Sequence, residues 1–179
     1  RCRALSEQHL GRLEWDAAVA SLANMCRPQG RFHEAVSLDR QVLGSARDRG
    51  VNLQQMWALH GLCRSHVALG DMAALDDAAR RLRAMVTDPE NDADSAISNN
   101  LSLLVADGVF AMNDGRVDAA VAPLARAAEL LGGVQEPQVY LEDAPGFIAD
   151  TILRCHLLGG RGMAATARAC HRGAKRLAR

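Results

Sequence analysis

Residues 113–131, NDGRVDAAVAPLARAAELL, contain the pattern that decides the fold. The apolar residues after the glycine recur three and four positions apart: Val117, Ala120, Val121, Leu124, Ala127, Ala128 and Leu131. That spacing places one apolar stripe along a helix. Gly115 precedes the stripe, and a glycine just past a helix end adopts the left-handed conformation at little steric cost. The stretch therefore predicts a turn that leads into a second helix. Pro123 lies early in that helix and is expected to bend it or to move its start downstream.

The same arrangement, a glycine between two segments of helical period, recurs along the chain. Gly30, Gly70, Gly115 and Gly160 each lie between two segments of helical period, and they are separated by 40, 45 and 45 residues. A fixed period in this range is typical of stacked helical hairpins. Alternation of period two, which would predict strands, is nearly absent. We therefore expect an all-α chain of about four antiparallel helix hairpins, with units at approximately 14–50, 51–90, 95–133 and 144–179. Ser95 is the expected N-cap of the third unit.

The repeat resembles the tetratricopeptide repeat, in which a hinge glycine joins two antiparallel helices. The residues that carry the resemblance are Leu22, Ala23, Gly30, Phe32 and Ala35, then Leu59, Leu62, Gly70, Ala78 and Ala79, then Gly108, Gly115, Ala120 and Ala127. The period is longer than the family's usual one of about 34 residues, and Pro89 and Pro137 come later than its closing proline. Such long units are similar to helical-repeat modules of bacterial multidomain regulators. The resemblance implies one right-handed α-solenoid domain over residues 1–179. The chain begins at Arg1 and ends in an unfinished helix, so we expect a fragment of a larger protein.

Composition excludes several classes of protein. Hydrophobic residues make up 49% of the chain, too many for wholesale disorder. Twenty-one basic residues balance 21 acidic ones, so no strong field draws the whole chain to nucleic acid or to a membrane. No apolar run approaches the roughly 18 residues of a membrane span. The five cysteines are scattered and odd in number, which favours reduced thiols and a cytoplasmic location. They are Cys2, Cys26, Cys63, Cys155 and Cys170.

No catalytic motif is present, so we expect no enzyme activity and no cofactor. The glycine cluster at 159–162 lacks the Lys and Ser/Thr of a phosphate loop and is interpreted as a hinge. His60, Cys63 and His66 include zinc-ligand types, but the two histidines lie about 120° apart around a helix, so we predict packing and no metal. The acidic residues at 88–94 include a proline and lack the glycine and terminal glutamate of an EF-hand, which favours a solvated loop.

The chain from residue 161 onward is basic and contains no acid: Arg161, Arg168, Arg172, Lys175, Arg176 and Arg179. A basic helix can meet nucleic acid or an anionic surface. We prefer a last repeat helix whose packing partner lies outside this fragment. Aromatic residues that would stack on single-stranded bases are missing there. Nucleic acid and membrane are therefore not expected partners.

The family resemblance implies that the first helix of each pair lines a concave groove. Counting back from each hinge glycine, the predicted partner-binding residues are Asn24, Arg27, Trp57, His60, Arg64, Phe147, Asp150 and Arg154. Asn24, Arg64 and Arg154 occupy equivalent positions and would donate hydrogen bonds to a peptide backbone or carboxylate. Trp57 and Phe147 would be aromatic anchors. The alternative is that the aromatic residues pack into the core and the arginines pair with neighbouring acids.

These observations predict a non-catalytic protein–protein interaction module of a cytoplasmic bacterial regulator. It would bind a peptide, a partner domain or a second copy of itself, through its groove or through its end helices, because repeat arrays leave uncapped ends unpaired. The alternative is a small-molecule-sensing domain of a transcription activator.

Overall fold

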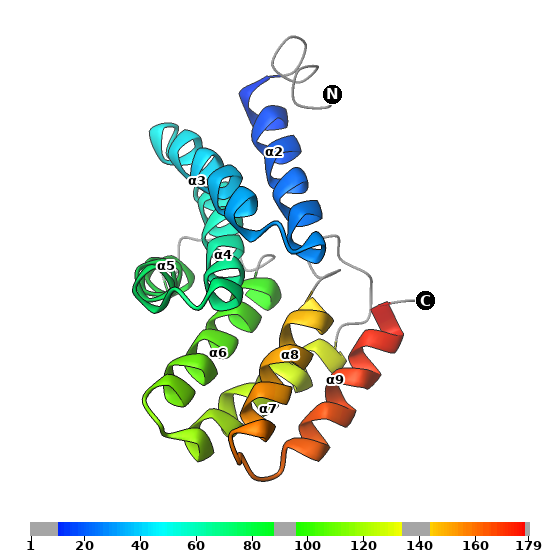
Figure 1. The fold of residues 1–179 in the computed structure, drawn as a ribbon. Helices are drawn as coiled ribbons and strands as arrows, with labels where there is room; N and C mark the ends of the chain where they lie inside the picture. The colour runs from blue at the N-terminus through cyan, green and yellow to red at the C-terminus, as the bar shows by residue number, and fades with distance from the viewer. Residues whose placement is uncertain (1–10, 88–95, 134–143, 178–179) are drawn as a thin grey trace. The chain divides into compact units, whose positions relative to one another are not determined.

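A computed structural model describes residues 11–87, 96–133 and 144–177, and every secondary-structure element in these ranges is helical (Figure 1). The prediction of an all-α chain is therefore confirmed for the described residues. The helices are α2 (Arg12–Cys26), the short 3-10 helix η1 (Arg27–Gln29), α3 (Phe32–Asp48), α4 (Asn52–Leu69), α5 (Met72–Val86), α6 (Ala96–Asn113), α7 (Val117–Gly133), α8 (Ala144–Leu157) and α9 (Met163–Leu177). None of the described helices combines the length and the apolar character that crossing a bilayer requires.

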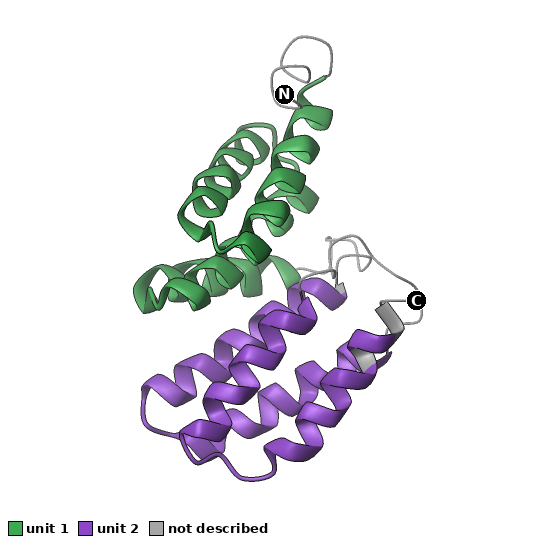
Figure 2. Ribbon diagram, turned by 45° about the vertical axis from the view of Figure 1, so that its right-hand side comes forward, with its two compact units in different colours: residues 1–95 green, residues 96–179 purple. Residues whose placement is uncertain are grey.

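The chain divides into two compact units, residues 1–95 and 96–179 (Figure 2). The division falls at the boundary predicted between the second and third helix pairs. That the units together form a single solenoid domain stays a prediction. Cys2, the acidic residues at 88–94 with Pro89, the Ser95 cap, Pro137 and Arg179 lie outside the described residues.

In unit 1, α3 packs against α2 and α4, and α4 packs against α5. Apolar residues of α3 and α5 face this core, where Ala35, Val42, Leu75 and Leu82 are buried. The axes of α4 and α5, the second helix pair, are not parallel. In Figure 1, α5 is seen nearly end-on, whereas α4 lies in the plane of the picture. Asp71 caps α5, since its carboxylate accepts a hydrogen bond from the backbone N–H of Ala74 at 3.1 Å.

In unit 2, α7 packs against α6, α8 and α9, and α8 packs against α9 (Figure 2). The stripe quoted from residues 113–131 forms the centre of this unit. Ala120, Leu124, Ala127 and Leu131 are fully buried. Close approach of α6 and α7 depends on Gly108, where a Cβ atom would lie 2.9 Å from the Leu124 side chain.

Three of the four predicted hinge glycines have the left-handed backbone: Gly30, Gly70 and Gly115, with φ between 70° and 73°. Helix α7 starts at Val117 although Pro123 lies within it, so the expectation that the proline moves the start of the helix downstream is wrong. Its position near the N-terminal end limits the lost backbone hydrogen bond to the first turns.

The fourth hinge is one residue earlier than predicted. Gly159, not Gly160, has the positive φ of 97°. The next backbone N–H, from Gly160, donates to the carbonyl of Cys155 at 2.9 Å, as Arg116 donates to Ala111 after Gly115. The alignment of the fourth unit therefore shifts by one residue. This shift decides which side chains of α8 are equivalent to those of the other first helices.

Candidate functional site

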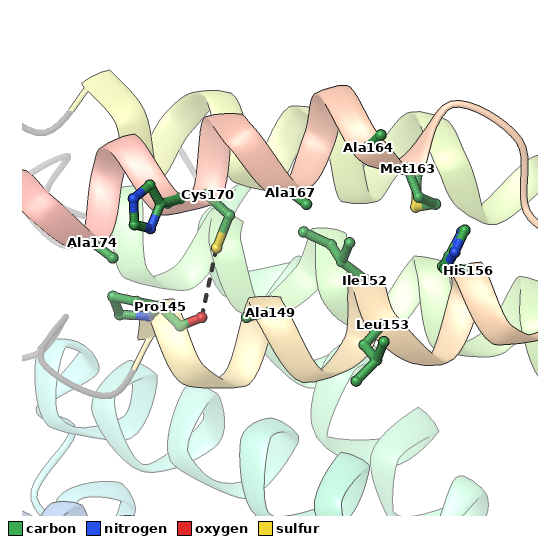
Figure 3. A pocket seen from close by; sticks show the side chains of 11 residues that line it. Pro145, Ala149, Ile152, Leu153, His156, Met163, Ala164, Ala167, Cys170 and Ala174 are labelled. Atoms are coloured by element: carbon green, nitrogen blue, oxygen red, sulfur yellow. Dashed lines mark hydrogen bonds between the residues drawn. The ribbon is translucent and has the colours of Figure 1, made fainter.

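An apolar groove lies between α8 and α9 in unit 2 and has a volume of about 340 Å³. Figure 3 shows side chains of both helices facing the space between them, with His156 and Met163 at one end and Pro145, Cys170 and Ala174 at the other. The remaining lining residues are Ala149, Ile152, Leu153, Ala164, Ala167 and His171. The polar side-chain groups of the lining are the two histidine rings and the Cys170 thiol, so the site is predominantly apolar.

The helical period explains why these two helices leave a groove open. On α8, Ile148 and Cys155 are fully buried in the core of unit 2, whereas Ala149, Leu153 and His156 are exposed and lie about 80–140° around the helix axis from Ile148. Leu153 is 54% exposed, and Leu157, next to it on the same edge, is 75% exposed. The helix thus has a core face and a second apolar face that no described residue covers fully.

The thiol of Cys170 ties the two helices together at one end of the groove. Its Sγ donates to the carbonyl oxygen of Pro145 at 3.6 Å, the dashed line in Figure 3. Burial raises the pKa of the Cys170 thiol above its ordinary value. The group therefore stays a thiol near neutral pH and acts in packing rather than as a nucleophile.

The edges of the groove differ in charge. Arg168, Arg172 and Lys175 are exposed on one side of α9, within about 80–140° of the lining residue Ala167 around the helix axis. On α8 the charged side chains are an ion pair, with Arg154 Nε 2.8 Å from Asp150 Oδ2. The α8 edge is therefore electrically balanced, and the α9 edge is positive.

The corrected hinge changes the outcome of the groove prediction in the fourth unit. The predicted residues Asp150 and Arg154 each lie one position away from a lining residue, Ala149 and Leu153. Counting from Gly159 gives Gly146, Ala149, Leu153 and His156 instead. Three of those four line the groove. Phe147 is half-buried and packs against the core of unit 2, while Asp150 and Arg154 are exposed as a pair.

In unit 1 the structure places several predicted binding residues in the interior. Arg27 is 5% exposed, and its Nη2 lies 2.5 Å from Asp39 Oδ2 on α3. Its Nε donates to Ser65 Oγ on α4 at 3.2 Å, and its Nη1 donates to Asn24 Oδ1 at 2.6 Å. Arg27 thus joins α2, η1, α3 and α4. Its contacts are those of a structural residue, not of a surface donor.

The other predicted residues of unit 1 lie on α4. His60 is 2% exposed and Arg64 is 4% exposed, while Trp57 is half-buried. Burial removes the first two from the surface that a partner would meet. That any of the eight predicted residues binds a partner stays a prediction.

The histidine and cysteine side chains of α4 are in an environment that disfavours charge. Burial, with Arg64 and Arg27 nearby, holds the pKa of His60 well below its ordinary range. Burial raises the pKa of the Cys63 thiol to about 12. Burial also lowers the pKa of His66, against the opposing effect of Asp71. Among the described residues, no three His, Cys, Asp or Glu side chains are grouped to hold a metal ion.

Lowering the pH from about 7.5 to about 5.5 is expected to reduce the free energy of unfolding through His60, by at most about 1.4 kcal/mol. The folded protein keeps this ring neutral, whereas the unfolded chain takes up a proton below its ordinary pKa of 6.5. Stability is therefore full above that pKa and is lost as the pH falls below it. Urea unfolding across this range measures the slope.

The matched variants are His60→Gln and His33→Gln, the second at an exposed position of α3. The first is expected to reduce the pH dependence, leaving the part due to His66, and the second to preserve it. Equal slopes in the two variants would contradict the assignment to His60.

The sequence prediction named none of the residues that line the groove, which are Pro145, Ala149, Ile152, Leu153, His156, Met163, Ala164, Ala167, Cys170, His171 and Ala174. One signal was available in the sequence. Leu153, Leu157 and Leu158 lie close together at the end of α8, and no single core face of a helix accommodates all three. All three are exposed in the structure.

Comparison of the chain with protein-family models, with curated proteins and with solved structures finds no match. The arrangement of helices is compatible with a helical-repeat domain.

Proposed function

We propose that this chain is a non-catalytic protein-interaction module of a larger, cytoplasmic bacterial regulator. Its binding site is the groove between α8 and α9, which accepts an apolar segment of a partner protein. The helix pairs around hinge glycines support a tetratricopeptide-like solenoid as the scaffold. Within such a scaffold, a further helix packs on a face of a helix pair like that of α8 and α9, which no described residue covers fully.

The observation that carries the proposal is the exposed apolar face of α8. Leu153, which lines the groove, and Leu157 and Leu158 after it in the chain are each more than half exposed. Soluble proteins rarely leave contiguous apolar surface uncovered unless another molecule binds there. The groove is also shaped by two helices, which is the usual setting for binding a third.

A second candidate function is the sensing of a small molecule. The groove volume of about 340 Å³ lies at the lower end of the range of ligand pockets, and His156 and His171 would orient a bound compound. The two functions differ in the size of the occupant, because a small molecule would leave the leucines at the end of α8 exposed.

The test uses a displayed library of amphipathic helical peptides selected on the wild-type protein. Leu153→Asp is expected to weaken binding of the selected peptides at least about tenfold, because a carboxylate then enters the apolar contact. The matched control is Leu13→Asp on α2, where the leucine is 53% exposed and lies outside the groove. Selected peptides that bind both variants equally would show that the groove is not the site.

A further inference from the structure

The shape of the groove specifies the form of its occupant. Four alanines, at positions 149, 164, 167 and 174, form much of its lining. Small side chains allow a third helix to approach closely, because interaxial distance depends on the side chains at the contact. The bulkier Leu153 and Leu157 stand on the α8 edge and would contact the side of such a helix. An apolar helix face matches this surface better than an extended strand, which requires a free sheet edge.

The charge of the α9 edge specifies the chemistry of the partner. Residues 151–179 contain no aspartate and no glutamate, although the chain as a whole is neutral. Arg168, Arg172 and Lys175 are exposed beside the groove, and no described residue forms an ion pair with them. Opposite charge across an interface speeds association and fixes the register of the partner. Carboxylates on the side of the bound helix that faces α9 would supply that charge.

We infer that the groove binds an amphipathic helix of another protein whose apolar face is flanked by acidic residues. The inference rests on the proposed function and adds the partner's chemistry to it. The helix lies along α8 and α9, its apolar residues contact the alanine lining and Leu153, and its glutamates or aspartates face Arg168 and Arg172.

Other occupants fit these observations less well. Interfaces with nucleic acid are polar and positively charged throughout, whereas the lining here is apolar. A membrane surface would contact the projecting leucines at the end of α8 but would leave the alanines that line the hollow uncovered. A symmetric pair of these chains through the same face would bring two basic α9 edges together, which repel each other.

The experiment compares three synthetic helical peptides that share one leucine and alanine face. Their flanking positions carry glutamate, lysine or glutamine, and a hydrocarbon staple gives them equal helicity. Binding to the whole chain is measured by fluorescence anisotropy at low and at high salt. The glutamate peptide is expected to bind at least about tenfold more tightly than the lysine peptide at low salt, and the difference is expected to shrink as salt screens exposed charges.

Two variants test whether the basic edge causes the preference. The double variant Arg168→Glu/Arg172→Glu is expected to bind the lysine peptide more tightly than the glutamate peptide, and Lys175→Glu is expected to reduce the preference. The control is Arg126→Glu on α7, where an exposed arginine pairs with Glu129 outside the groove. Thermal unfolding by circular dichroism verifies that each variant is folded.

The outcomes distinguish two claims: that the groove binds a protein segment, and that this segment is acidic. If no peptide binds the wild type, both the proposed function and this inference are wrong. If all three bind equally and Leu153→Asp abolishes binding, the groove binds proteins but the acidic partner is wrong. Tighter binding of DNA or of anionic vesicles than of the glutamate peptide, lost in the double variant, would also overturn the inference.

Discussion

Alanine in place of Gly61 is expected to lower the free energy of unfolding by about 3 kcal/mol or more, although it adds only a methyl group. A Cβ atom at this position of α4 would lie 2.0 Å from Arg27 Nη2 and 2.7 Å from Asp39 Oδ2. Both groups are the ends of side chains and can move aside. Moving them separates a buried ion pair, and each charge is then left without its partner in the interior.

The matched control is Gly44→Ala on α3. Gly44 also lies inside a helix, and nothing lies within 4 Å of the added Cβ atom. Alanine favours the helix by up to about 1 kcal/mol relative to glycine, so this variant is expected to be slightly more stable than the wild type. Urea or thermal unfolding measures both changes. If the Gly61→Ala protein were as stable as the Gly44→Ala protein, the added methyl group on α4 would not disturb the ion pair between Arg27 and Asp39, and the prediction would be wrong.

Arg27→Ala is expected to lower the free energy of unfolding by about 3–5 kcal/mol, because it leaves Asp39 charged and buried. Arg154→Ala is the comparison, since it also removes an arginine paired with an aspartate, but at an exposed position of α8. It is expected to change stability by under about 0.5 kcal/mol. The contrast in stability distinguishes the buried arginine, which holds the fold together, from the exposed arginine, which is accessible to a partner.

A double variant tests whether both losses of stability arise from the same buried ion pair. In the Arg27→Ala background, Gly61→Ala is expected to cost much less than in the wild type, because the ion pair that it disturbs is already absent. Coupling of this kind is characteristic of residues in direct contact. Additive losses would mean that the two residues act independently, and the geometric account of Gly61 would then be wrong.

The regular parts of the fold were predictable because they depend on local physics. The three- and four-residue spacing from Val117 to Leu131 places apolar residues on one helix face, and the structure buries that face. Gly30, Gly70 and Gly115 end helices in the left-handed conformation that glycine favours over other residues. Each of these features is contained within a few turns of helix.

The fourth hinge was not predictable in the same way, because glycines at 159, 160 and 162 offered several choices. The tertiary structure selects Gly159 for the turn, and places Gly160 against Cys155, where a Cβ atom would lie 2.6 Å from the sulfur. A one-residue shift in a helix rotates every side chain by about 100°. For this reason the prediction named Asp150 and Arg154, while Ala149 and Leu153 line the groove.

The sequence by itself determined the helical period, three of the four hinge glycines and the basic character of the last helix, because each depends on residues close together in the chain. Only the tertiary structure decided that Arg27 is buried and that the α8–α9 face is open. Arg27 is held by Asp39, 12 residues away, and by Ser65, 38 residues away. Burial depends on which surfaces meet after the chain has folded, and a pattern along a single helix does not contain that information.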